Sequence, residues 1–140
     1  MPGICFEDLS LGQSAELSYT VTADLIERFA EVSGDDNPVH LDQDYAVATQ
    51  FGGRIAHGML SASFISAVLG TRLPGKGAIY LSQSLRFRRP VRIGDQVTAR
   101  ATVTGLDAER ARATLETLCL VDGKTVLDGE AVVMVPRKEA

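Results

Sequence analysis

The chain has 140 residues, a net charge of −4 and a sequence pI of about 5.1. This length fits a single domain with one core, and 45% hydrophobic with 23% charged residues is typical of a globular protein rather than a disordered one. The acidic balance argues against a nucleic-acid-binding or anionic-membrane-binding protein, because no positive field attracts phosphates.

Neither a membrane span nor a secretion signal is expected. No apolar run reaches the roughly 18 residues that a bilayer requires, and residues 1–8 lack the basic patch and apolar stretch of a signal peptide. Cys5 and Cys119 fit no metal-ligand spacing and are expected to be free thiols in a reducing compartment. We therefore expect a cytoplasmic protein in which residues 1–140 form a single domain.

The chain begins with an expected strand and helix. Residues 15–21 alternate between polar and apolar and predict a strand. Thr22 can cap a helix that begins at Ala23 and ends at Gly34. The predicted apolar face of this helix consists of Leu25, Ile26, Phe29 and Val32.

A turn and a short helix are expected next. Residues 34–39 predict a turn, because Asp and Asn side chains bond their own backbone and Pro38 disfavours helix at the residue before it. Asp42 or Asp44 can then cap a short helix that runs through Ala48.

Residues 55–69 are apolar on nearly every helical face and carry no charge. A helix with this pattern is surrounded by protein, and the segment is too short to span a membrane. Small residues throughout allow a sheet to pack closely on it. We therefore expect a buried central helix.

The second half of the chain predicts strands. Residues 78–88 alternate well, and Pro90 ends that strand or places it at an edge. Turn signals separate three further expected strands, at residues 96–103, 111–121 and 125–135. The pattern predicts an α+β fold in which an antiparallel sheet wraps around a long central helix.

His40, one of the two histidines of the chain, directly follows the predicted turn in the turn-rich stretch of residues 33–40. Asp35 and His40 lie on the two sides of this turn, where a carboxylate and an imidazole can converge on one water molecule for general acid–base chemistry. The alternative is a surface turn that merely reverses the chain.

His57 and Gly58 lie near the start of the apolar helix. For His57 we favour a structural role, in which the ring bonds backbone across a loop, over a catalytic one. Gly58 can offer an unpaired N–H and the positive end of the helix dipole to a substrate oxygen. The alternative for Gly58 is that glycine only permits close packing.

Two groups of charged residues have ordinary interpretations. No Asp/His spacing matches a metal site, so a solvated acidic loop is favoured for Asp36, Asp42 and Asp44. The basic residues of the predicted strand region usually form a solvated face, although they can also meet the phosphates of a nucleotide-bearing substrate. These residues are Arg86, Arg88, Arg89 and Arg92.

Residues 33–40 resemble the Asp-x-Asn-Pro-x-His motif of the MaoC-like, or hydratase 2, family, and residues 56–60 follow at the usual distance. Residues 73–80 and 83–87 are similar to those of the single-domain (R)-specific enoyl-CoA hydratases. The resemblance extends from about residue 8 to Pro136. It implies a hot dog fold and a homodimer whose two sheets join near the active sites.

The resemblance also implies roles for individual residues. Asp35 and His40 would bind and activate water, with Asp35 as the general base, and the N–H of Gly58 would polarise the thioester carbonyl. A further set falls where family members line the acyl pocket. This set is Ser66, Leu69 and Val132.

The implied activity is reversible hydration of trans-2-enoyl-CoA to (R)-3-hydroxyacyl-CoA, in fatty acid or polyhydroxyalkanoate metabolism. A CoA thioester is the substrate, and no metal or redox cofactor is implied. Three alternatives remain: a 3-hydroxyacyl-[acyl-carrier-protein] dehydratase, a hot dog acyl-CoA thioesterase, and a non-catalytic subunit partner.

Overall fold

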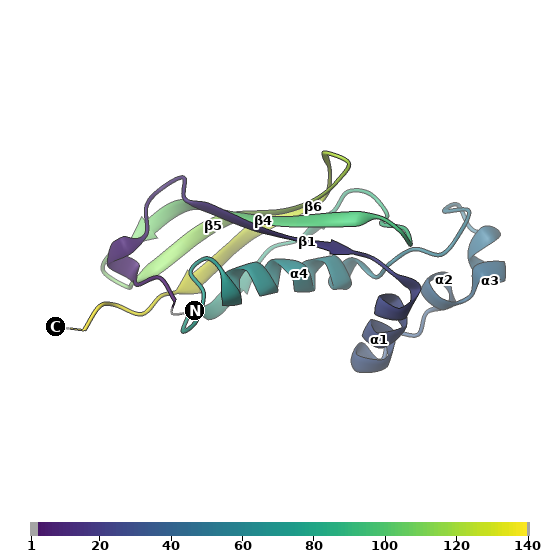
Figure 1. Cartoon of the computed structure of the whole chain (residues 1–140), viewed down its shortest axis with the longest axis horizontal. Coiled ribbons are helices and arrows are strands. Elements are labelled where there is room, and N and C mark those ends of the chain that lie inside the picture. Colours follow the sequence, from purple (N-terminus) through teal and green to yellow (C-terminus); the bar gives the residue numbers. More distant parts are fainter. Residues whose placement is uncertain (1–2, 140) are drawn as a thin grey trace.

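An antiparallel sheet and one long helix form the body of the protein (Figure 1). The computed structural model describes residues 3–139. The sheet has the strand order β1-β4-β5-β6-β2, and β3 also pairs with β6. The strands are β1 (Ser14–Thr20), β2 (Ile79–Gln83), β3 (Arg86–Phe87), β4 (Gln96–Asp107), β5 (Arg112–Val121) and β6 (Lys124–Met134).

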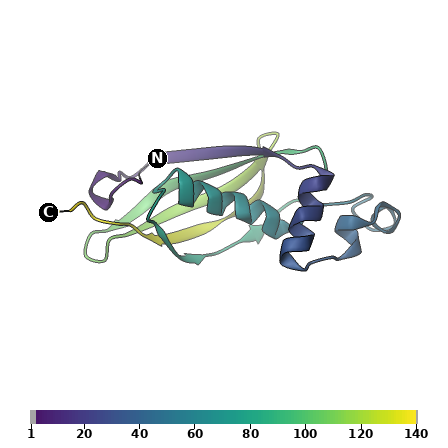
Figure 2. The same ribbon diagram turned by 60° about the horizontal axis from the view of Figure 1, so that its bottom comes forward.

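The helices are η1 (Phe6–Asp8), α1 (Ala23–Ser33), α2 (Pro38–Leu41), α3 (Gln43–Val47) and α4 (Gly58–Thr71). Helix α4 packs against the sheet, α1, α2 and α3 lie together at one end of the molecule, and the short 3-10 helix η1 lies at the other end (Figure 1). Helix α4 lies across one face of the sheet, where it contacts β1, β4, β5 and β6 (Figure 2). This is the hot dog arrangement, and it confirms the predicted fold.

Burial of α4 explains why its sequence is apolar all round. Its side chains meet the inward-facing residues of the strands, which alternate with partly exposed ones along β4 and β5. The ring of Tyr19 from β1 stacks on Phe64 of α4 with centroids 4.2 Å apart. The shared core fixes the position of α4, and with it the position of the N-terminus of this helix.

Local signals placed α1 correctly. The Thr22 hydroxyl accepts the N–H of Leu25 at 3.1 Å, and Gly34 ends the helix with φ of 81°. Ile26 is buried, but Val32 is 86% exposed, so its predicted place on the apolar face is wrong. Helix α1 points away from the sheet (Figure 1), and among residues 3–139 little covers Val32 near its C-terminal end.

The segment after α1 is more helical than the sequence predicted. Helix α2 begins at Pro38, within the expected turn, and the Asn37 side chain caps it by accepting the N–H of Val39 at 3.2 Å. Pro38 disfavours helix at the residue before it, yet it suits the first position of a new helix. Asp42 caps α3, as predicted.

The strand expected at residues 78–88 is interrupted. It forms β2 and β3, separated by Ser84 and Leu85, and both pieces pair with β6. Strand β2 ends the sheet, and its residues are exposed or half-buried in the single chain. The predicted meander is correct for β4, β5 and β6.

Both cysteines are free thiols, as expected. Cys119 is buried beneath α4, and burial raises the pKa of its thiol to about 12. Among residues 3–139, no helix has the length and apolar character needed to cross a membrane.

Candidate active site

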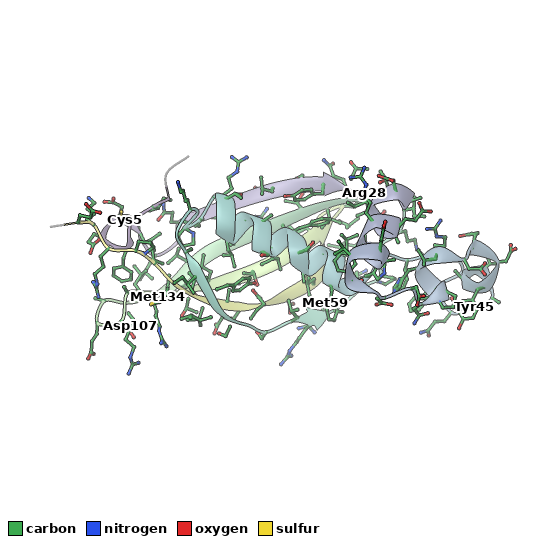
Figure 3. The ribbon with its side chains drawn as sticks, turned by 90° about the horizontal axis from the view of Figure 1, so that it is seen from below. Cys5, Arg28, Tyr45, Met59, Asp107 and Met134 are labelled. Carbon is green, nitrogen blue, oxygen red and sulfur yellow. The ribbon has the colours of Figure 1, made fainter. Side chains whose placement is uncertain are left out.

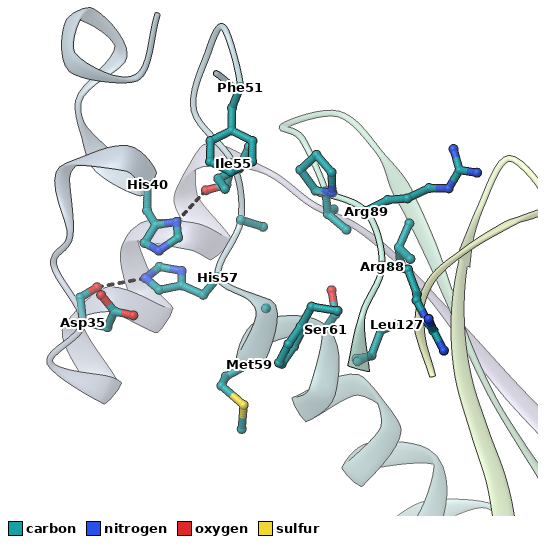
Figure 4. A pocket seen from close by; sticks show the side chains of 16 residues that line it. Asp35, His40, Phe51, Ile55, His57, Met59, Ser61, Arg88, Arg89 and Leu127 are labelled. Atoms are coloured by element: carbon teal, nitrogen blue, oxygen red, sulfur yellow. Dashed lines mark hydrogen bonds between the residues drawn. The ribbon is translucent and has the colours of Figure 1, made fainter. Parts of the chain in front are cut away.

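The fold brings Asp35, His40 and the N-terminus of α4 to one cavity of about 490 Å³ (Figure 4). The acid–base residues come from the turn after α1 and from α2, whereas Gly58 begins α4. The opposite wall comes from residues 87–91 and from β6. Segments far apart in the sequence therefore meet where the sequence predicted the chemistry.

The carboxylate of Asp35 is held by its own turn. Its Oδ1 accepts the N–H of Asn37 at 3.2 Å, and its backbone N–H donates to the hydroxyl of Ser33 at 3.1 Å. Oδ1 can accept further bonds, and the structure gives Oδ2 no partner among residues 3–139. The side chain therefore faces the cavity in a fixed orientation and retains capacity to accept a proton.

The hydrogen bond of His40 determines its tautomer. The ring is 9% exposed, and its Nδ1 lies 2.8 Å from the carbonyl oxygen of Ile55. A carbonyl only accepts, so Nδ1 carries the proton. In the neutral ring Nε2 therefore holds the lone pair and can accept a proton from water.

His57 lies directly against this pair. It is 2% exposed, its ring stacks on His40 with centroids 3.9 Å apart, and its Nε2 donates to the carbonyl oxygen of Asp35 at 2.9 Å. Burial lowers the pKa of His57; the hydrogen bond to Asp35 opposes this shift, and the neighbouring His40 adds to it. This bond across a loop to backbone is the contact that the structural interpretation of His57 predicted, while the choice between a structural and a catalytic role stays a prediction.

Gly58 occupies the first position of α4, where a backbone N–H has no acceptor within the helix. A Cβ added at Gly58 would lie 2.5 Å from the ring of Phe87, which is closer than real contacts allow. A side chain at position 58 would therefore force the exposed Phe87 ring to move, and this packing is compatible with a role for the N–H. The structure is thus compatible with both interpretations of Gly58, as an N–H donor to substrate and as a residue that permits close packing.

Arginines lie at the far rim of the cavity from Asp35 (Figure 4). Arg88 pairs with Asp128, with Nε and Oδ2 3.0 Å apart. Arg89 forms no ion pair within residues 3–139 and also borders a shallow hollow with Lys124. The guanidinium of Arg89 therefore lies at the mouth of the cavity without an ion-pair partner among the described residues.

The same cluster offers potential metal ligands. Atoms of Asp35, His40 and His57 lie within 4.8 Å of one another. Each ring already uses one nitrogen as a donor to a carbonyl, and a protonated nitrogen cannot bind a metal. One nitrogen of each ring therefore stays available as a ligand atom, as in metal-bound histidines, whose other ring nitrogen usually donates to a carbonyl. The available nitrogen of His57, Nδ1, is buried and has no partner among residues 3–139.

A second hollow flanks the middle of α4. Ser66 and Leu69 line a space of about 150 Å³ together with Tyr80 and Val133. Val132 does not line it, because neighbouring residues of a strand point to opposite faces; its role stays a prediction. A larger groove beside it shares Met59 with the catalytic cavity. Figure 3 shows Met59 near the N-terminal end of α4.

Sequence reasoning did not identify the partners of the two histidine rings, although a bond from His57 to backbone across a loop was expected. The carbonyl of Ile55 and the ring of His57 come from a segment that the sequence assigned to the helix itself. In the structure α4 begins only at Gly58, and residues 54–57 are extended. The local sequence signal for this boundary is Gly58, and it is weak, because glycine is unfavourable inside a helix without marking where the helix begins.

Comparison with known proteins agrees with this geometry. Residues 9–124 match the MaoC like domain. The chain is 60% identical over 133 residues to the (R)-specific enoyl-CoA hydratase of Rhodospirillum rubrum, covering 95% of this chain and 92% of that protein. It is 53% identical over 134 residues to the 3-hydroxybutyryl-CoA dehydratase of Methylorubrum extorquens, covering 96% and 85% respectively.

A solved structure extends the similarity to three dimensions. The unliganded R-hydratase PhaJ1 from Pseudomonas aeruginosa matches with a TM-score of 0.92 and 46% identity, over 97% of this chain and 88% of that one. The match therefore covers the sheet, α4 and the segment that carries the candidate site. The chain belongs to the family of proteins with a MaoC-like domain.

Proposed function

We propose that this protein is a hydro-lyase that hydrates trans-2-enoyl-CoA to (R)-3-hydroxyacyl-CoA and catalyses the reverse dehydration. The observation that carries the proposal is the meeting of Asp35, His40 and the N-terminus of α4 at one cavity. The relatives named as an enoyl-CoA hydratase and a 3-hydroxybutyryl-CoA dehydratase support both directions of this reaction.

Hydration begins with a water held between Asp35 and His40. The Asp35 carboxylate accepts one water proton, while Nε2 of His40 accepts a hydrogen bond from the other. As the water oxygen bonds to C3, the electrons of the double bond move onto C2 and the thioester oxygen. The oxygen thus acquires negative charge during the same step.

The N–H of Gly58 stabilises that charge. An N–H at the start of a helix lies at the positive end of the dipole, and one such donor is typically worth about 3 kcal/mol to a transition state. Asp35 then returns its proton to C2, which restores the carboxylate and completes the addition of one water. Because both hydrogen and oxygen arrive from the Asp35 side, addition is syn. The product is (R) when the substrate presents the corresponding face of C3 to the Asp35–His40 pair.

The rim arginines fit a substrate with a phosphate-bearing handle. Arg89 stands at the mouth of the cavity and has no ion-pair partner within the described part of the chain. Guanidinium groups bind phosphate through paired N–H donors. CoA and the phosphopantetheine arm of an acyl carrier protein share this chemistry, so relative rates on the two thioesters decide between the hydratase and a carrier-protein dehydratase.

We further propose that the working form is a homodimer joined at β2. This strand ends the sheet and exposes Ile79, Tyr80 and Leu81 by 52%, 41% and 41%. An apolar edge strand is a template for pairing with another chain. Pairing with β2 of a second copy would cover these side chains and extend the sheet across both subunits.

We also propose that the protein acts in the cytoplasm, and its free thiols are compatible with this location. Cys5 is half-buried, Cys119 is buried, and they form no disulfide. Thiols persist in compartments that keep cysteine reduced. Fractionation of the native organism tests this assignment separately from the activity.

The experiment that tests the activity follows purified protein with crotonyl-CoA. We expect loss of the enoyl absorbance without release of free thiol, and formation of (R)-3-hydroxybutyryl-CoA on chiral analysis. Release of thiol would indicate a thioesterase instead. Absence of any reaction in the purified chain would favour a non-catalytic subunit partner.

A further inference from the structure

A short extended segment between α3 and α4 bonds to both catalytic residues. We call residues 54–57 the clamp. Its Ile55 accepts the Nδ1–H of His40 at 2.8 Å, and its Arg54 donates Nε–H to the carbonyl of His40 at 2.7 Å. The N–H of Ile55 also donates to Val39 at 3.2 Å. The clamp therefore fixes His40 through its ring and through its backbone.

The last residue of the clamp fixes the other catalytic residue. Nε2–H of His57 donates to the carbonyl of Asp35 at 2.9 Å, and the His57 ring lies between His40 and Phe29 of α1. Nδ1 of His57 is buried and has no partner among residues 3–139. Protonation of Nδ1 would bury an unpaired N–H, so this environment favours the neutral ring.

The clamp is itself attached to the body of the protein. The N–H of Ala56 donates to the carbonyl of Val91 at 2.7 Å, and Ile55 forms a β-bridge with Arg92. Helix α4 begins at Gly58, directly after the clamp. One segment thus sets the distance between the Asp35–His40 turn and the helix N-terminus.

We propose that the clamp positions the general base against the thioester site, and that His57 is its principal positioning residue. This inference rests on the proposed function. His57 has a buried Nδ1 and so transfers no proton to substrate; it acts by holding the Asp35 backbone and supporting the face of His40. The titratable groups that act on it are Asp35 and His40.

Two substitutions separate positioning from simple stability. His57→Phe keeps an aromatic ring against His40 but removes the donor to Asp35, whereas His57→Gln places an amide N–H near the lost Nε2–H. Because small misplacement of catalytic groups costs large factors in rate, we expect kcat on crotonyl-CoA to fall about tenfold or more in His57→Phe, with KM within about twofold. His57→Gln is expected to recover most of the loss.

A stability control accompanies them. Thr22→Ala removes the cap of α1, which lies outside the site, and is expected to lower Tm without changing kcat of the folded enzyme. The proposal is overturned if His57→Phe keeps kcat within about twofold of wild type, or if His57→Gln is as slow as His57→Phe. Inactive wild-type enzyme would instead overturn the proposed function.

A measurement on the wild-type protein does not depend on whether the variants fold. The chain has two histidines, so nitrogen NMR of labelled imidazoles gives two ring systems, and the His57 ring is assigned by its through-space contact with the Phe29 ring. We expect a neutral His57 with its proton on Nε2 and, on His40, a proton on Nδ1. A proton on Nδ1 of His57 at neutral pH would overturn the clamp.

Discussion

The two hollows beside α4 differ in how their walls are held. At the N-terminus of the helix, the side chains that face the cavity are fixed by backbone carbonyls and by turn hydrogen bonds. Along the middle of the helix, Ser66 and Leu69 lie in a hollow lined mainly by apolar side chains. The positions of the catalytic side chains thus depend on main-chain geometry, whereas a single side-chain substitution can change the size and shape of the second hollow.

This contrast separates reaction from substrate choice. Substitutions at the N-terminal cavity should affect every substrate alike, because each enoyl thioester needs the same water and the same carbonyl donor. Substitutions in the second hollow should affect substrates according to chain length. The following predictions test that division, from the largest expected effect to the smallest.

The largest effect is expected at the acid–base pair. Asp35→Asn removes the proton acceptor, and His40→Ala removes the group that holds the water, so each should lower kcat on crotonyl-CoA by about a hundredfold or more. Stopped-flow or steady-state absorbance measures the rate, and circular dichroism checks the fold. Near-normal turnover in either variant would remove these residues from the mechanism.

A smaller and selective effect is expected in the second hollow. Ser66→Phe narrows the space beside Leu69, so kcat/KM for an eight-carbon enoyl-CoA should fall about tenfold or more while that for crotonyl-CoA changes little. Ser66→Ala is the matched control that keeps the space open. Equal losses on both chain lengths would show that this hollow does not take the acyl chain.

A substitution at the rim of the catalytic cavity should affect only the binding of the phosphate-bearing part of CoA. Arg89 is exposed, so its contact with phosphate is screened by water, and Arg89→Ala should raise KM for crotonyl-CoA by about fivefold. Crotonyl-pantetheine, which lacks phosphate, should show no change, and Arg110→Ala at a distant hairpin serves as the control. An equal effect on both thioesters would contradict a phosphate contact.

The smallest effect is expected on the pH dependence of the free energy of unfolding. Burial lowers the pKa of His57 from 6.5, so the unfolded chain binds more protons than the native protein just below that pH. The resulting stability is complete above 6.5 and is lost as pH falls through the folded value. His57→Phe should therefore flatten the decline of Tm on acidification, and parallel curves for the two proteins would contradict this.

The sequence was informative where one residue decides a local structure. Thr22, Gly34 and Asp42 each act on neighbouring backbone, and their predicted caps and stop are confirmed. The strand at residues 78–88 was less predictable, because its interruption follows from pairing with β6 rather than from its own pattern. Exposure of Val32 likewise depends on where α1 ends relative to the sheet.

The same division applies to the site. Asp35 and His40 are close in sequence, so their turn could be predicted to hold them together. The bonds from Ile55 and His57 depend on tertiary packing between segments 15 and 22 residues apart. Periodicity extended the apolar helix back to residue 55 and so concealed the clamp. The start of a helix that is set by contacts with distant segments cannot be predicted from the local sequence pattern.

The central claim is that one bound enoyl thioester meets the Asp35–His40 pair at C3 and the N–H of Gly58 at its carbonyl oxygen. A crystal structure of Asp35→Asn with crotonyl-CoA tests it most directly, because this variant should bind substrate without converting it. We predict the thioester oxygen within about 3.2 Å of the Gly58 nitrogen and C3 facing His40 across a water. A thioester oxygen directed away from α4, or C3 facing the wall opposite His40, would contradict the account.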